Sequence, residues 1–335
     1  MKKTIAIIGA GGFGIAFAKL LSSYEKYSII LWSAVEKEIE EILTHKENKK
    51  LLPGVFLNLE KVYITTNKEK LNQADIVIFA VASKYMRVVV QTIKDYLKKD
   101  VILLNASKGL ETNSFKRMSE IIFDETKSEK IAVISGPSHA EEVAKLKPTT
   151  VVIASKNLKL AEYLQNILFS NSFRVYVNED IIGVEIAAAL KNIFALAIGI
   201  CDGMKLGDNL KAALMTRGLV EMERFGVFLG ANSKTFTGLA GLGDLIVTCT
   251  SLLSRNKRAG ILIGEGIKAK KAIEKINMTV EGYFATKIVY EFSKKNNLNM
   301  PIVEQLYKVL FQDEDVEKVI LNLMTRTKKH EYENF

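Results

Sequence analysis

Two charged side chains occur in segments where a purely structural sequence would carry apolar ones. Lys191 lies within AAALKNIFALAIGI, a run that is apolar all round and predicts a buried helix. Burial disfavours an ammonium ion and lowers the pKa of a lysine toward the range useful for proton transfer. Asp244 follows a glycine turn (GLG) at the start of another apolar helix, where its carboxylate can orient or charge-pair a buried lysine. Lys191 and Asp244 are therefore the candidate catalytic pair. The structural alternative is a lysine that reaches solvent at the helix edge.

The tripeptide Ser254-Arg255-Asn256 has the features of an anion-binding helix start. Arginine presents a planar fork of donors, and the first N–H groups of a helix have no partner within it. This segment therefore predicts a seat for a phosphate group. The alternative is a capped helix with a surface arginine.

Two further polar segments follow predicted strands, at the sheet edge where such folds bind ligands. In SKGL at residues 107–110, Lys108 can face an anionic substrate or cofactor, or it is a solvated loop lysine. In SGPSHA at residues 135–140, we expect Ser138 to cap a helix whose first N–H groups face the cofactor.

A glycine-rich loop, GAGGFG, directly follows the first predicted strand and precedes the helix-like IAFAKLLSS. Its glycines are Gly9, Gly11, Gly12 and Gly14. In this pattern the first glycine permits a tight turn, the second lets the backbone approach a pyrophosphate, and the third lets helix meet strand. The loop, placed between strand and helix, predicts dinucleotide binding rather than an ordinary glycine turn.

The choice between NAD and NADP stays open. An acidic residue about 20 residues further on, at the end of the second strand, usually indicates NAD, whereas NADP recruits a basic one. This sequence has LWSAVEK there, with Glu36 and Lys37 each a few residues late.

Short β-branched runs alternate with helix-period segments up to about residue 178, which is typical of strand–crossover–strand units and a largely parallel sheet. The predicted strands are residues 4–9, 28–32, 62–66, 75–81, 101–107, 131–136, 150–154 and 174–177. The remainder shows helical spacing. The fold class is therefore α/β: an N-terminal Rossmann-like, mostly parallel sheet domain followed by an all-helical domain. We place the dinucleotide-binding domain at 1–180 and the helical substrate-binding domain at 181–335, with a cleft at their junction.

The composition narrows the remaining classes. Of 335 residues, 48% are hydrophobic and 25% are charged, which excludes a disordered chain and a bundle of membrane spans. The apolar stretch 181–200 contains Glu185, Lys191 and Asn192, so we expect a buried helix and no integral membrane segment. The net charge of +9 comes from scattered lysines, which do not predict a nucleic-acid partner. With two cysteines and three histidines, the sequence predicts no metal site and favours a reducing, cytoplasmic location.

These motifs together resemble bacterial-type NAD(P)-dependent glycerol-3-phosphate dehydrogenase. They are GAGGFG, SKGLE at 107–111, ISGPS at 134–138, FRVY at 173–176, ALKN at 189–192, DG at 202–203, GLAGLGDLIVTCTS at 238–251, SRN at 254–256 and VEGY at 280–283. They occur in order through nearly the entire chain. The resemblance implies reversible hydride transfer between NAD(P)H and dihydroxyacetone phosphate, which gives sn-glycerol 3-phosphate for phospholipid synthesis.

The resemblance also implies roles for individual residues. Lys191 would be the proton donor and acceptor, with Asp244 beside it. The substrate would lie against Lys108, Gly136, Ser138, Lys191, Asp244, Ser254, Arg255 and Asn256. The cofactor would lie against Gly9, Gly11, Gly12, Phe13, Gly14, Lys108, Ala140, Arg255, Thr279 and Glu281.

The sequence departs from the family pattern at two positions. Phe13 stands where Trp or Tyr is frequent, which keeps an aromatic ring. Ala34 stands where a basic residue commonly faces the adenine-ribose phosphate, which argues against a preference for NADP.

A related two-domain hydroxy-acid dehydrogenase with another substrate is the alternative function. A homodimer is compatible with the resemblance, although no segment marks an interface.

Overall fold

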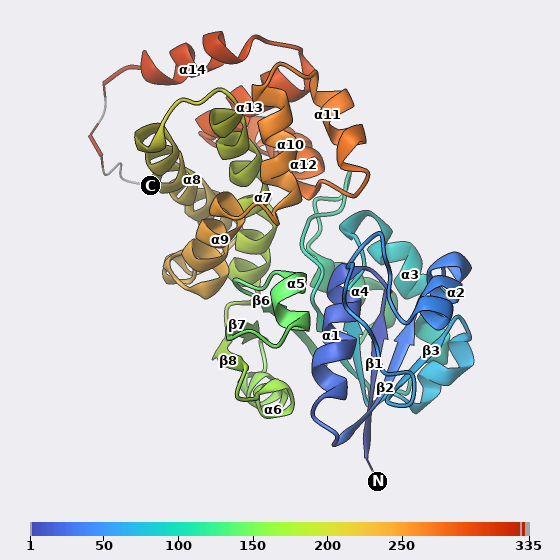
Figure 1. The fold of residues 1–335 in the computed structure, drawn as a ribbon. Helices are drawn as coiled ribbons and strands as arrows, with labels where there is room; N and C mark the ends of the chain where they lie inside the picture. Colours follow the sequence, from blue (N-terminus) through green and yellow to red (C-terminus); the bar gives the residue numbers. More distant parts are fainter. Residues whose placement is uncertain (1, 329, 332–335) are drawn as a thin grey trace. The chain divides into compact units, whose positions relative to one another are not determined.

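The computed structural model describes residues 2–328 and 330–331, which divide into two compact units (Figure 1). The sheet unit comprises Met1–Glu111 and Lys116–Glu185. The helical unit comprises Thr112–Phe115 and Ile186–Phe335. The chain therefore passes between the units three times, because the short segment Thr112–Phe115 belongs to the helical unit although its neighbours on both sides do not.

The sheet unit is built on eight strands in the order β3-β2-β1-β4-β5-β6-β7-β8. Their bounds are β1 (Lys3–Ile8), β2 (Tyr27–Trp32), β3 (Val62–Thr65), β4 (Ile76–Phe79), β5 (Ile102–Asn105), β6 (Ile131–Ser135), β7 (Thr149–Ala154) and β8 (Phe173–Asn178). All neighbouring strands pair in parallel except β6 and β7, which are antiparallel. The predicted mostly parallel sheet is confirmed, with one reversal that the sequence pattern did not indicate.

Helices complete this unit, because the central strands are apolar on both faces. Every residue of β4 and β6 is buried. Strands of this kind need a layer on each side, and crossover helices supply it. These helices are α1 (Gly12–Ser22), α2 (Glu36–His45), α3 (Met86–Ile93), α4 (Met118–Thr126), α5 (Ala140–Ala144) and α6 (Leu158–Leu168). In the core, the rings of Phe17 on α1 and Phe173 on β8 meet edge to face, with centroids 6.2 Å apart.

The helical unit is all-helical in its described residues, as predicted. Its helices are α7 (Ile181–Gly203, whose first five residues belong to the sheet unit), α8 (Asp208–Phe228), α9 (Asp244–Thr250), α10 (Arg255–Gly264), α11 (Ala269–Ile276), α12 (Glu281–Lys295), α13 (Pro301–Phe311) and α14 (Val316–Met324). Figure 1 shows them in green to red. Among the described residues, α7 alone is long and apolar enough to cross a membrane, but 94% of its most apolar window is buried inside the protein. The prediction of a buried core helix is confirmed.

Glycines let α10 approach the backbone of α7 closely. Gly199 on α7 and Gly260 on α10 face each other, and a Cβ on Gly260 would come 2.8 Å from Gly199 Cα. One turn further on, a Cβ on Gly264 would come 3.0 Å from Gly203 Cα. Any larger residue at these positions would push the helices apart. The close packing brings the start of α10 to the middle of α7.

Candidate active site

Lys191 forms a buried polar cluster on the helical unit. Its ammonium nitrogen lies 2.5 Å from Asp244 Oδ1 and donates to Thr248 Oγ1 at 2.8 Å. Lys191 is 6% exposed, Asp244 1% and Thr248 4%. The lysine therefore does not reach solvent at the helix edge, and its charge is compensated by a carboxylate. This is the pairing that the sequence predicted.

The local sequence explains how Asp244 and Thr248 face the same way. Asp244 is the first residue of α9, directly after a single turn of π-helix at Leu239–Gly243. Thr248 lies one helical turn later, so both side chains share a helix face. The Thr248 hydroxyl donates to the Asp244 carbonyl at 2.6 Å, which leaves its oxygen oriented to accept from Lys191.

The segment Ser254-Arg255-Asn256 is a helix start, as predicted, and its serine caps the helix as in the alternative interpretation. Ser254 is the N-cap of α10, and its hydroxyl accepts from the Lys257 N–H at 3.2 Å. Arg255 is the first residue of the helix. A helix N-terminus beside an arginine is a favourable place for an anion.

Asn256 links α10 to the helix that carries Lys191. Its side-chain nitrogen donates to Asn192 Oδ1 at 2.9 Å, and its oxygen accepts from the Gly282 N–H at 2.8 Å. Both ends of the amide are therefore engaged, and the side chain has one orientation. Asn192, next to Lys191 in sequence, belongs to this network but is not among the predicted site residues.

In the sheet unit, Lys108 and Ser138 converge on one carbonyl group. Gly136 O accepts from Ser138 Oγ at 2.9 Å and from Lys108 Nζ at 3.4 Å. Gly136 has a φ of +129°, a region that favours glycine. The prediction that Ser138 caps a helix is wrong: α5 begins at Ala140 with His139 as its N-cap, and the Ser138 hydroxyl bonds to the preceding turn instead.

The glycine loop has the geometry of a phosphate-binding turn. Gly9 has a φ of +109°, and a Cβ on Gly14 would overlap the Gly9 carbonyl oxygen. Around Gly11, the N-cap of α1, there is open space where a Cβ would be, and no side chain caps the helix. The residues therefore fit a dinucleotide, whose pyrophosphate would lie at this helix N-terminus.

The remaining predicted cofactor residues lie at the starts of helices or beside them. A Cβ on Gly12 would come 3.9 Å from the Ala140 Cβ, so α5 begins next to the glycine loop. Phe13 packs edge to face on Phe17, with ring centroids 4.9 Å apart. In the helical unit, Glu281 is the first residue of α12 and Thr279 lies two residues before it.

The predicted residues thus gather in two places. The first place is the helical unit, where Lys191 and Asp244 are in contact and Asn256 is hydrogen-bonded to helix α7. The same unit contains Ser254, Arg255, Thr279 and Glu281. The sheet unit holds Gly9, Gly11, Gly12, Phe13, Gly14, Lys108, Gly136, Ser138 and Ala140. Within the described residues, no group of three or more His, Cys, Asp or Glu side chains is arranged to hold a metal ion.

One polar network was not predicted. It lies near the loop that follows β5 and carries Lys108 (residues 106–111, the Lys108 loop). Glu185, on the first turns of α7, is buried and accepts hydrogen bonds from Asn105 at 3.2 Å and from Arg117 at 2.8 Å. It also accepts from the backbone and the hydroxyl of Ser119. Burial raises the pKa of the Glu185 carboxyl, while Arg117 acts in the opposite direction. The only sequence signal was a glutamate inside an apolar run.

The sheet unit has eight strands and a glycine loop after the first of them, and the helical unit holds a buried lysine. Together these features define the class of two-unit dinucleotide-binding dehydrogenases. Two family models agree with this class. The N-terminal model of NAD-dependent glycerol-3-phosphate dehydrogenase matches residues 4–161, and the C-terminal model matches residues 180–321. The chain belongs to the family of NAD-dependent glycerol-3-phosphate dehydrogenases.

Individual relatives match over nearly the full length. A glycerol-3-phosphate dehydrogenase (NAD(P)+) of Fusobacterium nucleatum is 47% identical over 334 residues, which cover 99% of each chain. One of Clostridium tetani is 48% identical over 329 residues, covering 98% of this chain and 94% of the relative. The crystal structure of glycerol-3-phosphate dehydrogenase from Coxiella burnetii is 37% identical with a TM-score of 0.92, covering 97% of this chain and 99% of that one.

Proposed function

We propose that this protein catalyses the reversible, NAD(P)-dependent interconversion of dihydroxyacetone phosphate and sn-glycerol 3-phosphate. The observation that carries the proposal is the buried Lys191 ammonium held by Asp244 and Thr248. A buried charged cluster of this kind is costly for stability alone, and a buried lysine held by a carboxylate is suited to proton transfer. Membership of the family supports the same assignment.

The sheet unit would hold the cofactor through the glycine loop and the N-terminus of α1. Gly9, Gly11, Gly12 and Gly14 would leave room for the pyrophosphate, and Phe13 and Ala140 would border it. When bound, the reduced nicotinamide supplies a hydride to the carbonyl carbon of the substrate.

Lys191 would supply the proton that this reduction needs. As the carbonyl carbon gains a hydride, its oxygen acquires negative charge, and the Lys191 ammonium would donate a proton from Nζ to that oxygen to form the hydroxyl. In the reverse direction, the neutral amine would take the hydroxyl proton. Asp244 and Thr248 would hold Nζ in one position throughout, without taking the proton themselves.

The phosphate group of the substrate would be held away from the reacting carbon. Arg255 offers a bidentate fork at the N-terminus of α10, and Ser254 and Asn256 flank it. Lys108, Gly136 and Ser138 would line the substrate from the sheet unit. Binding energy gained at a remote phosphate helps to fix the reacting carbonyl for transfer.

The wider role follows from this reaction. We place dinucleotide binding in residues 1–180 and substrate binding in residues 181–335. The product would be the phosphorylated glycerol used in phospholipid synthesis.

The two cysteines, Cys201 and Cys249, are free thiols, which supports a reducing compartment such as the cytoplasm. The partner is a small phosphorylated molecule, and a homodimer is our expectation for its assembly.

The test is an absorbance assay at the nicotinamide band with dihydroxyacetone phosphate, run separately with NADH and with NADPH. We expect turnover with the phosphorylated ketone and very little with dihydroxyacetone, which lacks the phosphate. Equal turnover of the two ketones would contradict the proposed phosphate seat. Turnover of 2-keto acids instead would favour a hydroxy-acid dehydrogenase. The ratio of the rates with the two coenzymes gives the coenzyme preference.

A further inference from the structure

Asn105 is a buried amide that binds the backbone next to Lys108. It is the last residue of β5 and is 1% exposed. Its Oδ1 accepts from the Ser107 N–H at 2.9 Å, and its Nδ2 donates to the Ser107 carbonyl at 3.0 Å. One side chain therefore holds both backbone groups of the residue that precedes Lys108.

Asn105 is itself held by α7. Its Nδ2 also donates to Glu185 Oε1 at 3.2 Å. Because Glu185 is bound by Arg117 and by Ser119 as well, its carboxylate cannot turn away from the amide without breaking other buried hydrogen bonds. The amide thus has a fixed orientation.

The Ser107 side chain ties the same turn to the neighbouring strand. Its hydroxyl oxygen accepts from the Val81 N–H at 3.0 Å, just beyond the end of β4. Val81 also lies beside the glycine loop, because a Cβ on Gly9 would come 2.9 Å from its side chain. The turn that carries Lys108 is therefore connected to the predicted cofactor loop.

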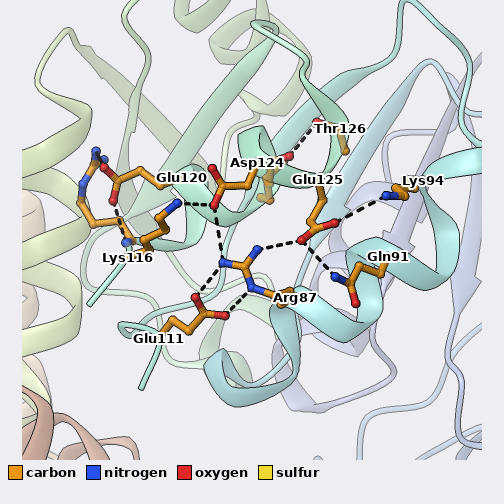
Figure 2. Close-up of polar contacts among 11 residues, drawn as sticks. Arg87, Gln91, Lys94, Glu111, Lys116, Glu120, Asp124, Glu125 and Thr126 are labelled. Atoms are coloured by element: carbon orange, nitrogen blue, oxygen red, sulfur yellow. Dashed lines mark hydrogen bonds and ion pairs between the residues drawn. The ribbon is translucent and has the colours of Figure 1, made fainter. Parts of the chain in front are cut away.

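The other end of the Lys108 loop is fixed by an ion-pair cluster (Figure 2). Arg87 binds Glu111 with two parallel hydrogen bonds of 2.7 Å and binds Glu125 at 2.7 Å. The Glu111 N–H also donates to the Lys116 carbonyl at 2.9 Å, which closes a narrow hairpin. Lys108 thus lies between two anchors, and its backbone has little freedom to shift.

We propose that Asn105 is a positioning residue for the dehydrogenase reaction, which acts by holding the backbone of Ser107 so that Lys108 is directed toward the Gly136 carbonyl and the substrate. The inference rests on the proposed function. It assigns to Asn105 no contact with substrate or cofactor. Its chemical requirement is an amide, which offers an acceptor to the Ser107 N–H and a donor to the Ser107 carbonyl at the same time.

A double-mutant cycle with Lys108 tests this assignment. Asn105→Ala should lower kcat/KM for dihydroxyacetone phosphate by about 10- to 100-fold, the effect of a misplaced binding group. In a Lys108→Ala background, the same substitution should cost less than about threefold, because the side chain that it positions is already gone. Equal losses in both backgrounds would overturn the inference, since Asn105 would then act independently of Lys108.

The near-isosteric Asn105→Asp variant provides a second readout, should the alanine variant fail to fold. An ionised aspartate keeps an acceptor for the Ser107 N–H but loses the donor to the Ser107 carbonyl. The charged groups around this aspartate would be the Glu185 carboxylate, Arg117 on the far side of Glu185, and Lys108 on the adjoining turn. The pKa of the new aspartate should be raised by burial and by Glu185. A protonated aspartic acid restores the donor, so kcat/KM relative to the wild type should recover as the pH falls. A ratio that does not change with pH would contradict the role of the donor.

A matched control separates positioning from loss of stability. Ser155 is also 1% exposed and lies just after a strand of the sheet unit, where its hydroxyl donates to the Ile131 carbonyl at 2.8 Å. Ser155→Ala should lower the free energy of unfolding but leave KM for the substrate unchanged.

If the wild-type enzyme does not turn over dihydroxyacetone phosphate, both the proposed function and this inference fail. If the wild type is active and the cycle is additive, only the inference fails.

Discussion

Replacing Lys191 by Met removes the proposed proton donor and keeps much of its volume. A positioned general acid contributes about 10²- to 10⁴-fold to a rate, so kcat should fall by that factor. The substitution should also destabilise the helical unit. Because Asp244 is 1% exposed, it would lose its ammonium partner while buried, which costs about 3–5 kcal/mol in comparable cases.

The two effects can be separated by removing both charges. In the double variant Lys191→Met/Asp244→Asn the buried site is neutral, so most of the lost stability should return, since neutral replacements of buried ion pairs are often tolerated. Turnover should stay as low as in the single variant, because no proton donor has been restored.

The assays are urea unfolding for stability, steady-state turnover of dihydroxyacetone phosphate, and NADH binding by fluorescence. NADH affinity should stay close to that of the wild type in both variants, since the glycine loop is unchanged. A Lys191→Met enzyme that keeps kcat within about threefold of the wild type would refute the proton-transfer role. Recovery of activity together with stability in the double variant would show that the lysine acts only through the fold.

Three further predictions concern other groups. Burial raises the pKa of Glu221 from 4.5 to about 7, so the folded state binds its proton more tightly than the unfolded chain does. Stability should then fall by about 3 kcal/mol as the pH rises from 4.5 to 7, and urea unfolding of Glu221→Gln should show a shallower pH dependence. Arg255→Ala should chiefly raise KM for dihydroxyacetone phosphate, at least about tenfold; an unchanged KM would remove Arg255 from the phosphate seat. Burial raises the pKa of Cys201 to about 11 and of Cys249 to about 12, so neither thiol should react with a disulfide reagent at pH 8 until denaturant is added, and rapid labelling of the native protein would contradict their burial.

Features with a local signal could be predicted from the sequence. The strands, the glycine loop and the start of α10 each depend on residues close together in the chain. Lys191 could be singled out because a charge inside a wholly apolar helix is costly anywhere in a fold, and its pairing with Asp244 followed from the same cost.

Features that join distant segments could not be predicted. Asn105 meets Glu185 across 80 residues, and Glu221 accepts from the first two N–H groups of α13 across 81 and 82 residues. Nothing in the local pattern marks either pair, because the partners are brought together only by tertiary packing. The antiparallel pairing of β6 with β7 was also hidden, since the connection between them, which contains a helix, is long enough for a parallel crossover too.

The assignment of Glu185 to the sheet unit has a practical consequence for truncation. An expression fragment that stops at residue 180 would retain all eight strands but would lack this carboxylate. Arg117, Ser119 and Asn105 would then lose a shared acceptor in the interior, and unsatisfied buried donors are costly. A cloned nucleotide-binding fragment that extends through the first turns of α7 should therefore express in a more stable form than one cut directly after β8.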